Sequence, residues 1–131
     1  MQYRVFMDFL DDKGRNLIHE WLLSLRVPTR QDFQRKLEAL EQMQRPPTNF
    51  LKKLKHGECA GLWEVRLDRD NTEWRILGFQ GPGNGQHTLA FVARERDYKF
   101  EPRSACKLAH KRRVAVLNDP KRRTCAHRWD T

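Results

Sequence analysis

Apolar and polar positions along the chain change their period several times, and each change predicts a new element. Residues 2–9 alternate loosely between ring or branched side chains and polar ones, which predicts a first strand. The Asp11-Asp12 pair interrupts this pattern, and apolar side chains then recur at helical spacing over residues 17–25. We therefore expect a helix that ends before Pro28, with Asp11 or Asp12 capping its first turn and facing the positive end of its dipole.

A second apolar stripe at helical spacing follows Thr29 and runs from Phe33 to Met43. It ends at the Pro46-Pro47 pair, because proline lacks the amide hydrogen and disfavours a helical residue before it. The two helices are expected to form a hairpin. Each has one apolar stripe, so each must pack against a sheet or against the other helix.

From Leu62 onward the period is two, which predicts strands over residues 62–67, 74–79 and 88–92. A polar turn separates the first two strands, and a loop rich in glycine, residues 81–85, separates the last two. The pattern predicts an antiparallel meander of three strands. Together with the N-terminal strand, the meander makes a small twisted sheet in an α+β fold.

The last helical segment begins at Glu101-Pro102, because proline in a first turn costs little, and it extends over residues 103–117. Its apolar face is narrow, so we expect a weakly docked helix. Residues 118–131 combine Asn-Asp-Pro punctuation with a basic run and few apolar anchors, which predicts a mobile tail. With 131 residues in all, the chain is expected to form one domain over residues 1–117, followed by this tail.

Charge points to the kind of partner rather than to the chemistry. Charged residues make up 33% of the chain and the formal net charge is +9, so a polyanion such as RNA, DNA or an acidic protein is the expected partner. The charge is uneven, since residues 101–131 hold nine Lys/Arg against three Asp/Glu. The C-terminal end is therefore expected to face the polyanion.

The cysteines predict a reduced protein. Cys59, Cys106 and Cys125 form no CxxC pair, their number is odd, and the N-terminus lacks the apolar region of a signal peptide. We therefore expect free thiols and a cytoplasmic location, and no apolar run approaches the ~20 residues needed to cross a bilayer. The spacing of Cys106, His110, Cys125 and His127 matches no usual zinc-ligand pair, so neither a metal nor a cofactor is expected.

The order of elements and several short motifs resemble the RelE/ParE superfamily of bacterial toxins, and within it the phage-derived, HigB-like branch. The resemblance covers about residues 2–117 and rests on Leu54-Lys55, on the runs 61–66, 74–79 and 91–94, and on the Glu101-Pro102 helix start with Ala105 and Ala109. It implies the toxin of a type II toxin–antitoxin system that cuts mRNA on the ribosome. The implied partners are the ribosome, mRNA and a cognate antitoxin with a helix-turn-helix, without membrane or small-molecule cofactor.

The resemblance also implies site residues. Arg66, Arg75 and Arg94 fall on basic positions of the family's sheet face, Tyr98 lies close to a family tyrosine, and Glu64 replaces a lysine that RelE carries. A guanidinium group stays charged and matches phosphate oxygens, so these arginines suit a pentacovalent phosphorane better than proton abstraction. The residues expected to bind RNA are Lys52, Lys53, Lys55, Arg96 and Lys99.

Several alternatives stay open from the sequence. Metal-free cleavage by the 2′-hydroxyl needs a proton acceptor, and the candidates are Glu64, His87 and Tyr98. Glu64 beside Arg66 is expected to have a lowered pKa, and the pair also fits a plain ion pair on a solvated face. The rival functions are a ParE-like inhibitor of DNA gyrase without nuclease activity and a non-catalytic phage protein that binds nucleic acid. Arginines at all three sheet positions favour the nuclease.

Overall fold

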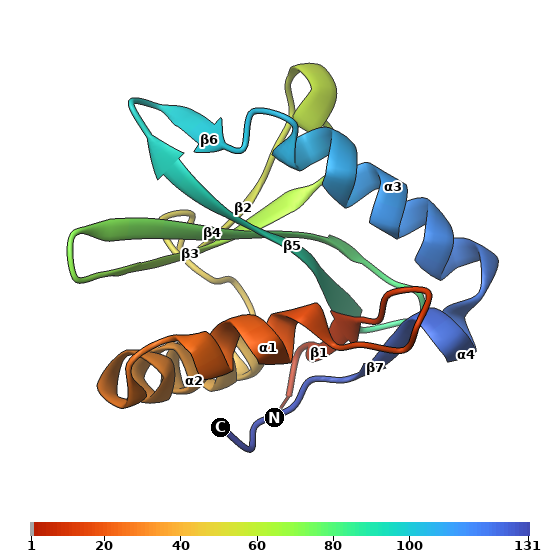
Figure 1. Ribbon diagram of the computed structural model, residues 1–131, viewed down its shortest axis with the longest axis horizontal. Coiled ribbons are helices and arrows are strands. Elements are labelled where there is room, and N and C mark those ends of the chain that lie inside the picture. Colours follow the sequence, from red (N-terminus) through yellow and green to blue (C-terminus); the bar gives the residue numbers. More distant parts are fainter. Residues whose placement is uncertain (1) are drawn as a thin grey trace.

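A computed structural model describes residues 2–131 and confirms an α+β fold built on one twisted sheet (Figure 1). In chain order the elements are β1 (Val5–Phe9), α1 (Leu17–Ser24), α2 (Val27–Gln42), β2 (Leu51–Lys53), the 3-10 turn η1 (Gly57–Cys59), β3 (Trp63–Arg69), β4 (Thr72–Gln80), β5 (Gln86–Arg96), β6 (Lys99–Glu101), α3 (Ala105–Asn118), α4 (Pro120–Arg123) and β7 (Thr124–Ala126).

The strands are ordered β2-β3-β4-β5-β1-β7, and β6 pairs with the far end of β5. The meander β3-β4-β5 is antiparallel, as predicted. Strand β1 runs parallel to β5 and lies between β5 and β7. Helices α1 and α2 both pack on one face, where Trp21 of α1 stacks on Phe33 of α2, and α3 crosses the other face (Figure 1). We call these the α1–α2 face and the α3 face.

Alternation along the strands divides the core between the two faces. On the α1–α2 face, Val65, Leu67 and Ile76 pack against the apolar stripes of the two helices, including Leu22 and Phe33. On the α3 face, Leu62, Leu77 and Ala93 pack against Ala105 and Ala109 of α3. The small alanines of α3 let the helix lie close to the sheet. Each predicted apolar stripe is therefore buried, including the narrow one.

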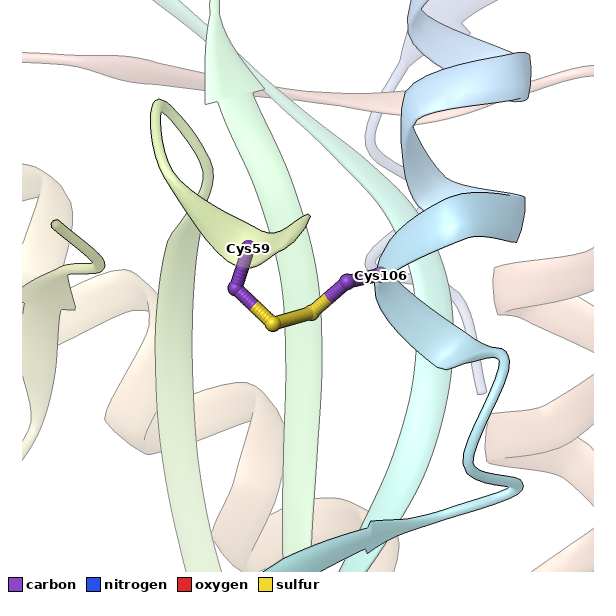
Figure 2. The surroundings of a disulfide bond; sticks show 2 residues. All are labelled: Cys59 and Cys106. Carbon is purple, nitrogen blue, oxygen red and sulfur yellow. A yellow bond between two sulfur atoms is a disulfide. The ribbon is translucent and has the colours of Figure 1, made fainter. Parts of the chain in front are cut away.

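A disulfide joins Cys59 in η1 to Cys106 in the first turn of α3 (Figure 2). The expectation of free thiols is wrong for these two residues and holds for Cys125. Spacing did not reveal the pair, because 47 residues separate the cysteines and only the docking of α3 on the sheet brings them together. The link ties the start of α3 to the segment between β2 and β3.

The first helix is capped by a residue other than the predicted ones. The Asn16 side chain accepts a hydrogen bond from the His19 amide at 2.9 Å, which places the N-cap four or five residues later than expected. Asp11 instead accepts bonds from the amides of Lys13 and Arg15 and so stabilises the preceding turn. The helix begins at Leu17, in agreement with the apolar pattern.

Three strands of three residues each, β2, β6 and β7, were not predicted, since such segments are too short to show a period. Strand β6 follows β5 through a two-residue turn in which Asp97 and Tyr98 both have positive φ, at 51° and 63°. This is the turn geometry that matches the twist of a hairpin. The segment from Lys99 to Glu101 is therefore a strand, and α3 begins at Ala105 rather than at residue 103.

The C-terminal residues form an ordered part of the sheet and not the mobile tail that the sequence predicted. Strand β7 pairs antiparallel with β1. Beyond it, His127 is buried, with Nδ1 2.6 Å from Asp8 Oδ1 and Nε2 2.8 Å from Gln34 Oε1. Arg123 also donates a bond to the Leu10 carbonyl. The segment has few apolar side chains, and polar side chains anchor it instead. No helix over residues 2–131 is long and apolar enough to span a membrane.

Candidate functional site

The α3 face carries a polar strip farther along the strands than the residues on which α3 packs. It consists of Glu64 and Arg66 on β3, Arg75 on β4 and Glu95 on β5, with Asp68 at its edge. Arg66 is directly opposite Arg75 in the β3–β4 register, and directly opposite residues point to the same face. Of the predicted catalytic residues, the structure therefore brings Glu64, Arg66 and Arg75 together.

Arg75 is the centre of the strip and is fully buried. Its Nη1 lies 2.6 Å from Asp68 Oδ1 and donates to the Trp74 carbonyl, while its Nε lies 3.5 Å from Glu95 Oε1 and its Nη2 4.0 Å from Glu73 Oε2. Burial would lower its pKa, but the hydrogen bond that it donates to Asp68 and the charges of the nearby carboxylates raise it overall. Arg75 is thus a permanently charged group inside a shell of acids, out of contact with solvent.

Glu64 differs from the sequence-based expectation. It is buried, and this burial raises the pKa of its carboxyl group above the ordinary value, although the charges of Arg66 and Arg75 oppose the shift. The predicted lowering is wrong because it counted the neighbouring arginine without the desolvation. A carboxylate with a raised pKa binds a proton more readily, so Glu64 is better suited to general base chemistry than the sequence indicated.

Arg66 is the more exposed of the two arginines in the strip. Its side chain is 28% exposed, and its Nε lies 3.8 Å from Glu64 Oε1, which is an ion pair rather than a hydrogen bond. The two residues are neighbours on one strand, two positions apart, and not partners across strands. Lys52 lies opposite Glu64 in the β2–β3 register and adds an exposed cation to the same face.

Arg94 lies apart from the other two arginines. It is opposite Trp74 in the β4–β5 register, and Trp74 packs against Trp21 on the α1–α2 face, so Arg94 faces that side. It is half exposed and pairs with Glu101 of β6 at 3.4 Å. The three arginines therefore do not share one sheet face. Arg75 lies opposite Ala93 in the β4–β5 register, and Arg94 is the next residue along β5, so its side chain points to the other face.

Tyr98 stands at the tip of the β5–β6 hairpin and is 99% exposed. Its positive φ is a conformation that bulky side chains rarely adopt, so the turn presents the ring at some cost in backbone energy. Arg96 and Lys99, opposite each other beside the tip, are also exposed. A groove of about 720 Å3 runs between this hairpin and the β3–β4 hairpin, and it is lined by Asp68, Glu73, Arg94, Glu95, Arg96 and Glu101 among others.

The predicted RNA-binding lysines of residues 52–55 are all exposed but do not share one face. Lys52 lies opposite Glu64 in the β2–β3 register and is on the α3 face, whereas Lys53 lies opposite Trp63 and is on the α1–α2 face. Lys55 follows the end of β2, outside the strand. The lysine run thus wraps around the free edge of the sheet.

His87 is not placed for proton transfer in the strip. It lies on the α1–α2 face, where its ring makes edge contacts with Phe6 and Trp63. Complete burial, helped by the charge of Arg4, lowers the pKa of His87 to about 3. The imidazole is therefore neutral at physiological pH, and of the three acceptor candidates only Glu64 belongs to the strip.

Sequence reasoning missed the acids that hold Arg75, namely Asp68, Glu73 and Glu95. Their spacing does contain a signal, since Glu64, Arg66 and Asp68 alternate on one strand while Glu73 and Arg75 alternate on the next. Residues two apart on a strand share a face, so alternating signs on adjacent strands indicate an ion-pair network.

Comparisons with known proteins identify one family. The family model described as Phage derived protein Gp49-like (DUF891) matches residues 20–114, which include β2 to β6 and most of α3. The matched region contains the whole polar strip and the β5–β6 hairpin. Searches of curated proteins and of solved structures each found no match.

Proposed function

The chain belongs to the Gp49-like family of phage-derived proteins, a family associated with RelE-like toxins, and from this premise we propose that it is a HigB-like toxin of a type II toxin–antitoxin system. In this proposal it acts as a ribosome-dependent endoribonuclease on mRNA. A helix-turn-helix antitoxin neutralises it. The observation that carries the proposal is the pairing of a buried Glu64, whose pKa is raised, with a partly exposed Arg66 on one strand.

The proposed reaction needs no metal. Glu64 accepts the proton of the 2′-hydroxyl as the 2′-oxygen attacks the adjacent phosphorus. The bond from phosphorus to the 5′-oxygen then breaks, which leaves a 2′,3′-cyclic phosphate on one fragment and a 5′-hydroxyl, protonated from water, on the other. Arg66 stabilises the extra negative charge on the phosphorane, a role in which one lost donor typically costs ~100- to 1000-fold in rate.

Arg75 has a positioning role in this proposal. Its guanidinium is buried and bound to Asp68, so it does not contact the scissile phosphate but fixes the charge and geometry around Glu64. The β5–β6 hairpin, with Arg96, Tyr98 and Lys99 exposed around its tip, supplies a surface for the RNA strand. Lys52 lies opposite Glu64 and contacts a neighbouring phosphate.

One observation favours the ParE-like alternative, inhibition of DNA gyrase without cleavage of RNA. Arg75 is neutralised by carboxylates, and Arg94 pairs with Glu101 on the opposite face. A nuclease face with three free arginines is therefore not assembled, and this removes an argument for the nuclease that the sequence provided. Gyrase inhibition does not require such a face.

Induced expression separates the two functions. The nuclease proposal predicts growth arrest with new 5′ ends inside translated regions of mRNA and unchanged plasmid supercoiling. The Glu64→Gln variant should express, fold and leave the transcripts intact. Arrest with intact transcripts and gyrase-linked DNA breaks would assign the protein to the ParE-like class.

A further inference from the structure

A cationic cleft lies at one end of the sheet, where Trp63 begins β3 and Gln80 ends β4, and it extends to the edge strand β2. Trp63 and Lys53 place it on the α1–α2 face, opposite the polar strip. Two cavities, of about 340 and 470 Å3, adjoin there and share Arg4 and Gln80 in their walls. Both volumes are in the range of small-molecule and nucleotide sites. The cleft extends from the glycine-rich β4–β5 loop, residues 81–85, to the lysines of β2.

The charge of this cleft is of one sign. Arg4, Arg45, Lys52, Lys53 and Lys55 line it, and no carboxylate of residues 2–131 lines either cavity. Within residues 2–131 none of these five cations forms a salt bridge, whereas the groove beside the polar strip is lined by five acidic residues. Cations without acidic partners on low-dielectric walls attract anions most strongly.

Arg4 is fixed in place by the end of α2. Its Nη1 donates to the carbonyls of Leu40 and Met43, the latter at 2.8 Å. Glu41, the acid whose charge acts on Arg4, is buried, and its carboxylate accepts bonds from the Phe6 amide and the Gln2 side chain. The Arg4 guanidinium is thus held at the cleft wall by backbone carbonyls, and within residues 2–131 it forms no salt bridge with Glu41.

An aromatic ring and amide groups accompany the cations. Trp63 is only partly buried and lines the larger cavity, opposite Lys53 in the β2–β3 register. Gln44 and Gln80 contribute side-chain amides to the same wall. Phosphate-binding cations, an aromatic face and amides that pair with base edges are the combination that binds single-stranded nucleic acid.

We infer that this cleft is a second binding site, for the phosphate backbone and a stacked base of single-stranded RNA. The choice of RNA rather than another polyanion rests on the proposed function. The inference that an anion binds here rests on the volume and the cationic lining of the cleft. It would hold a part of the strand that is distant from the reacting phosphate, because the polar strip is on the other face of the sheet.

Fluorescence anisotropy with a short labelled single-stranded RNA tests the cleft. Arg45→Ala combined with Lys53→Ala removes two exposed cations, and the matched control, Lys107→Ala combined with Lys111→Ala, removes two exposed cations of α3. The cleft variant should bind about tenfold more weakly at low salt, and its log–log salt slope should fall by roughly 1.4, or 0.7 for each contact. The control should stay within about twofold of the wild type. Equal losses in both variants would overturn the site.

The aromatic contact provides a second readout. RNA should quench part of the tryptophan fluorescence, and Trp63→Phe should remove that quenching while the other three tryptophans remain. Polyglutamate that binds the cleft as tightly as RNA would overturn the assignment of the ligand. These measurements do not involve cleavage. A protein that cuts mRNA on ribosomes with unchanged binding in the cleft variant would keep the proposed function and exclude the cleft.

Discussion

The Arg75 guanidinium lies 2.6 Å from the Asp68 carboxylate, and the arginine is fully buried while the aspartate is largely exposed. The same guanidinium also faces Glu95 at 3.5 Å. This relationship assigns Arg75 to the scaffold of the polar strip instead of to direct contact with RNA. It also means that substitution of Arg75 affects folding as well as activity.

Arg75→Ala should lower the free energy of unfolding by about 2 to 4 kcal/mol, because it leaves a cavity and several acids without their cation. Urea denaturation followed by circular dichroism measures the loss. The matched control is Arg94→Ala, which removes a half-exposed arginine and should change stability by less than about 0.5 kcal/mol. Equal stability of the two variants would show that Arg75 is not a structural centre.

Glu64→Gln should leave a folded protein whose stability relative to the wild type increases with pH. The pKa of Glu64 is raised in the folded state, so the folded protein binds more protons than the unfolded one and loses stability as pH rises through that window. Glutamine keeps the size of the side chain and removes this loss. Urea midpoints of the variant and the wild type at pH 4 and at pH 8 give the difference in stability between the two proteins at each pH. A variant whose stability relative to the wild type is lower at pH 8 than at pH 4 would contradict the raised pKa.

His87 should make the protein sensitive to acid. Its pKa is lowered to about 3 from an ordinary value of 6.5, so the unfolded state takes up a proton below pH 6.5 while the folded state does not. Stability is therefore present above pH 6.5 and falls by about 2 kcal/mol between pH 7.5 and pH 5 from this residue alone. His87→Leu should lack that part of the decrease. Parallel stability curves of the two proteins between pH 7.5 and pH 5 would exclude the account.

The C-terminal segment should be needed for full stability. His127→Ala removes the buried contacts to Asp8 and Gln34 and should cost about 2 to 4 kcal/mol, because both partners remain buried. Arg128→Ala is the matched control, since the Arg128 side chain is half exposed and pairs with the exposed Asp130. Truncation after Asn118 removes β7 and should be at least as damaging as His127→Ala. A truncated protein with wild-type stability would restore the sequence-based prediction of a dispensable tail.

Sequence patterns predicted the long elements because their periods are sustained. The apolar stripes of α1 and α2 and the alternation of β3 and β4 each extend over several repeats. The spacing of apolar residues is therefore enough to identify these elements. The strands β2, β6 and β7 have three residues each and form only because a neighbouring strand offers its edge. Such pairing depends on tertiary structure, which a local pattern does not contain.

The candidate site was predicted only in part, for the same reason. Alternation on β3 correctly placed Glu64 and Arg66 on one face, opposite Val65. The position of Arg94 depends on the register between β4 and β5, and the burial of Arg75 depends on acids from three strands. Neither can be read from a single strand. The disulfide between Cys59 and Cys106 likewise follows from the docking of α3.

Primer extension on a defined mRNA tests whether the protein cleaves mRNA on the ribosome with Glu64 as proton acceptor. Purified wild-type protein and Glu64→Gln are each incubated with the mRNA alone and with the mRNA in translating ribosomes. New 5′ ends are expected only when wild-type protein and ribosomes are both present. For the Glu64→Gln variant, the cleavage rate should fall by ~100-fold or more. Cleavage by the variant at the wild-type rate, or intact mRNA with ribosomes and wild-type protein, would contradict this mechanism.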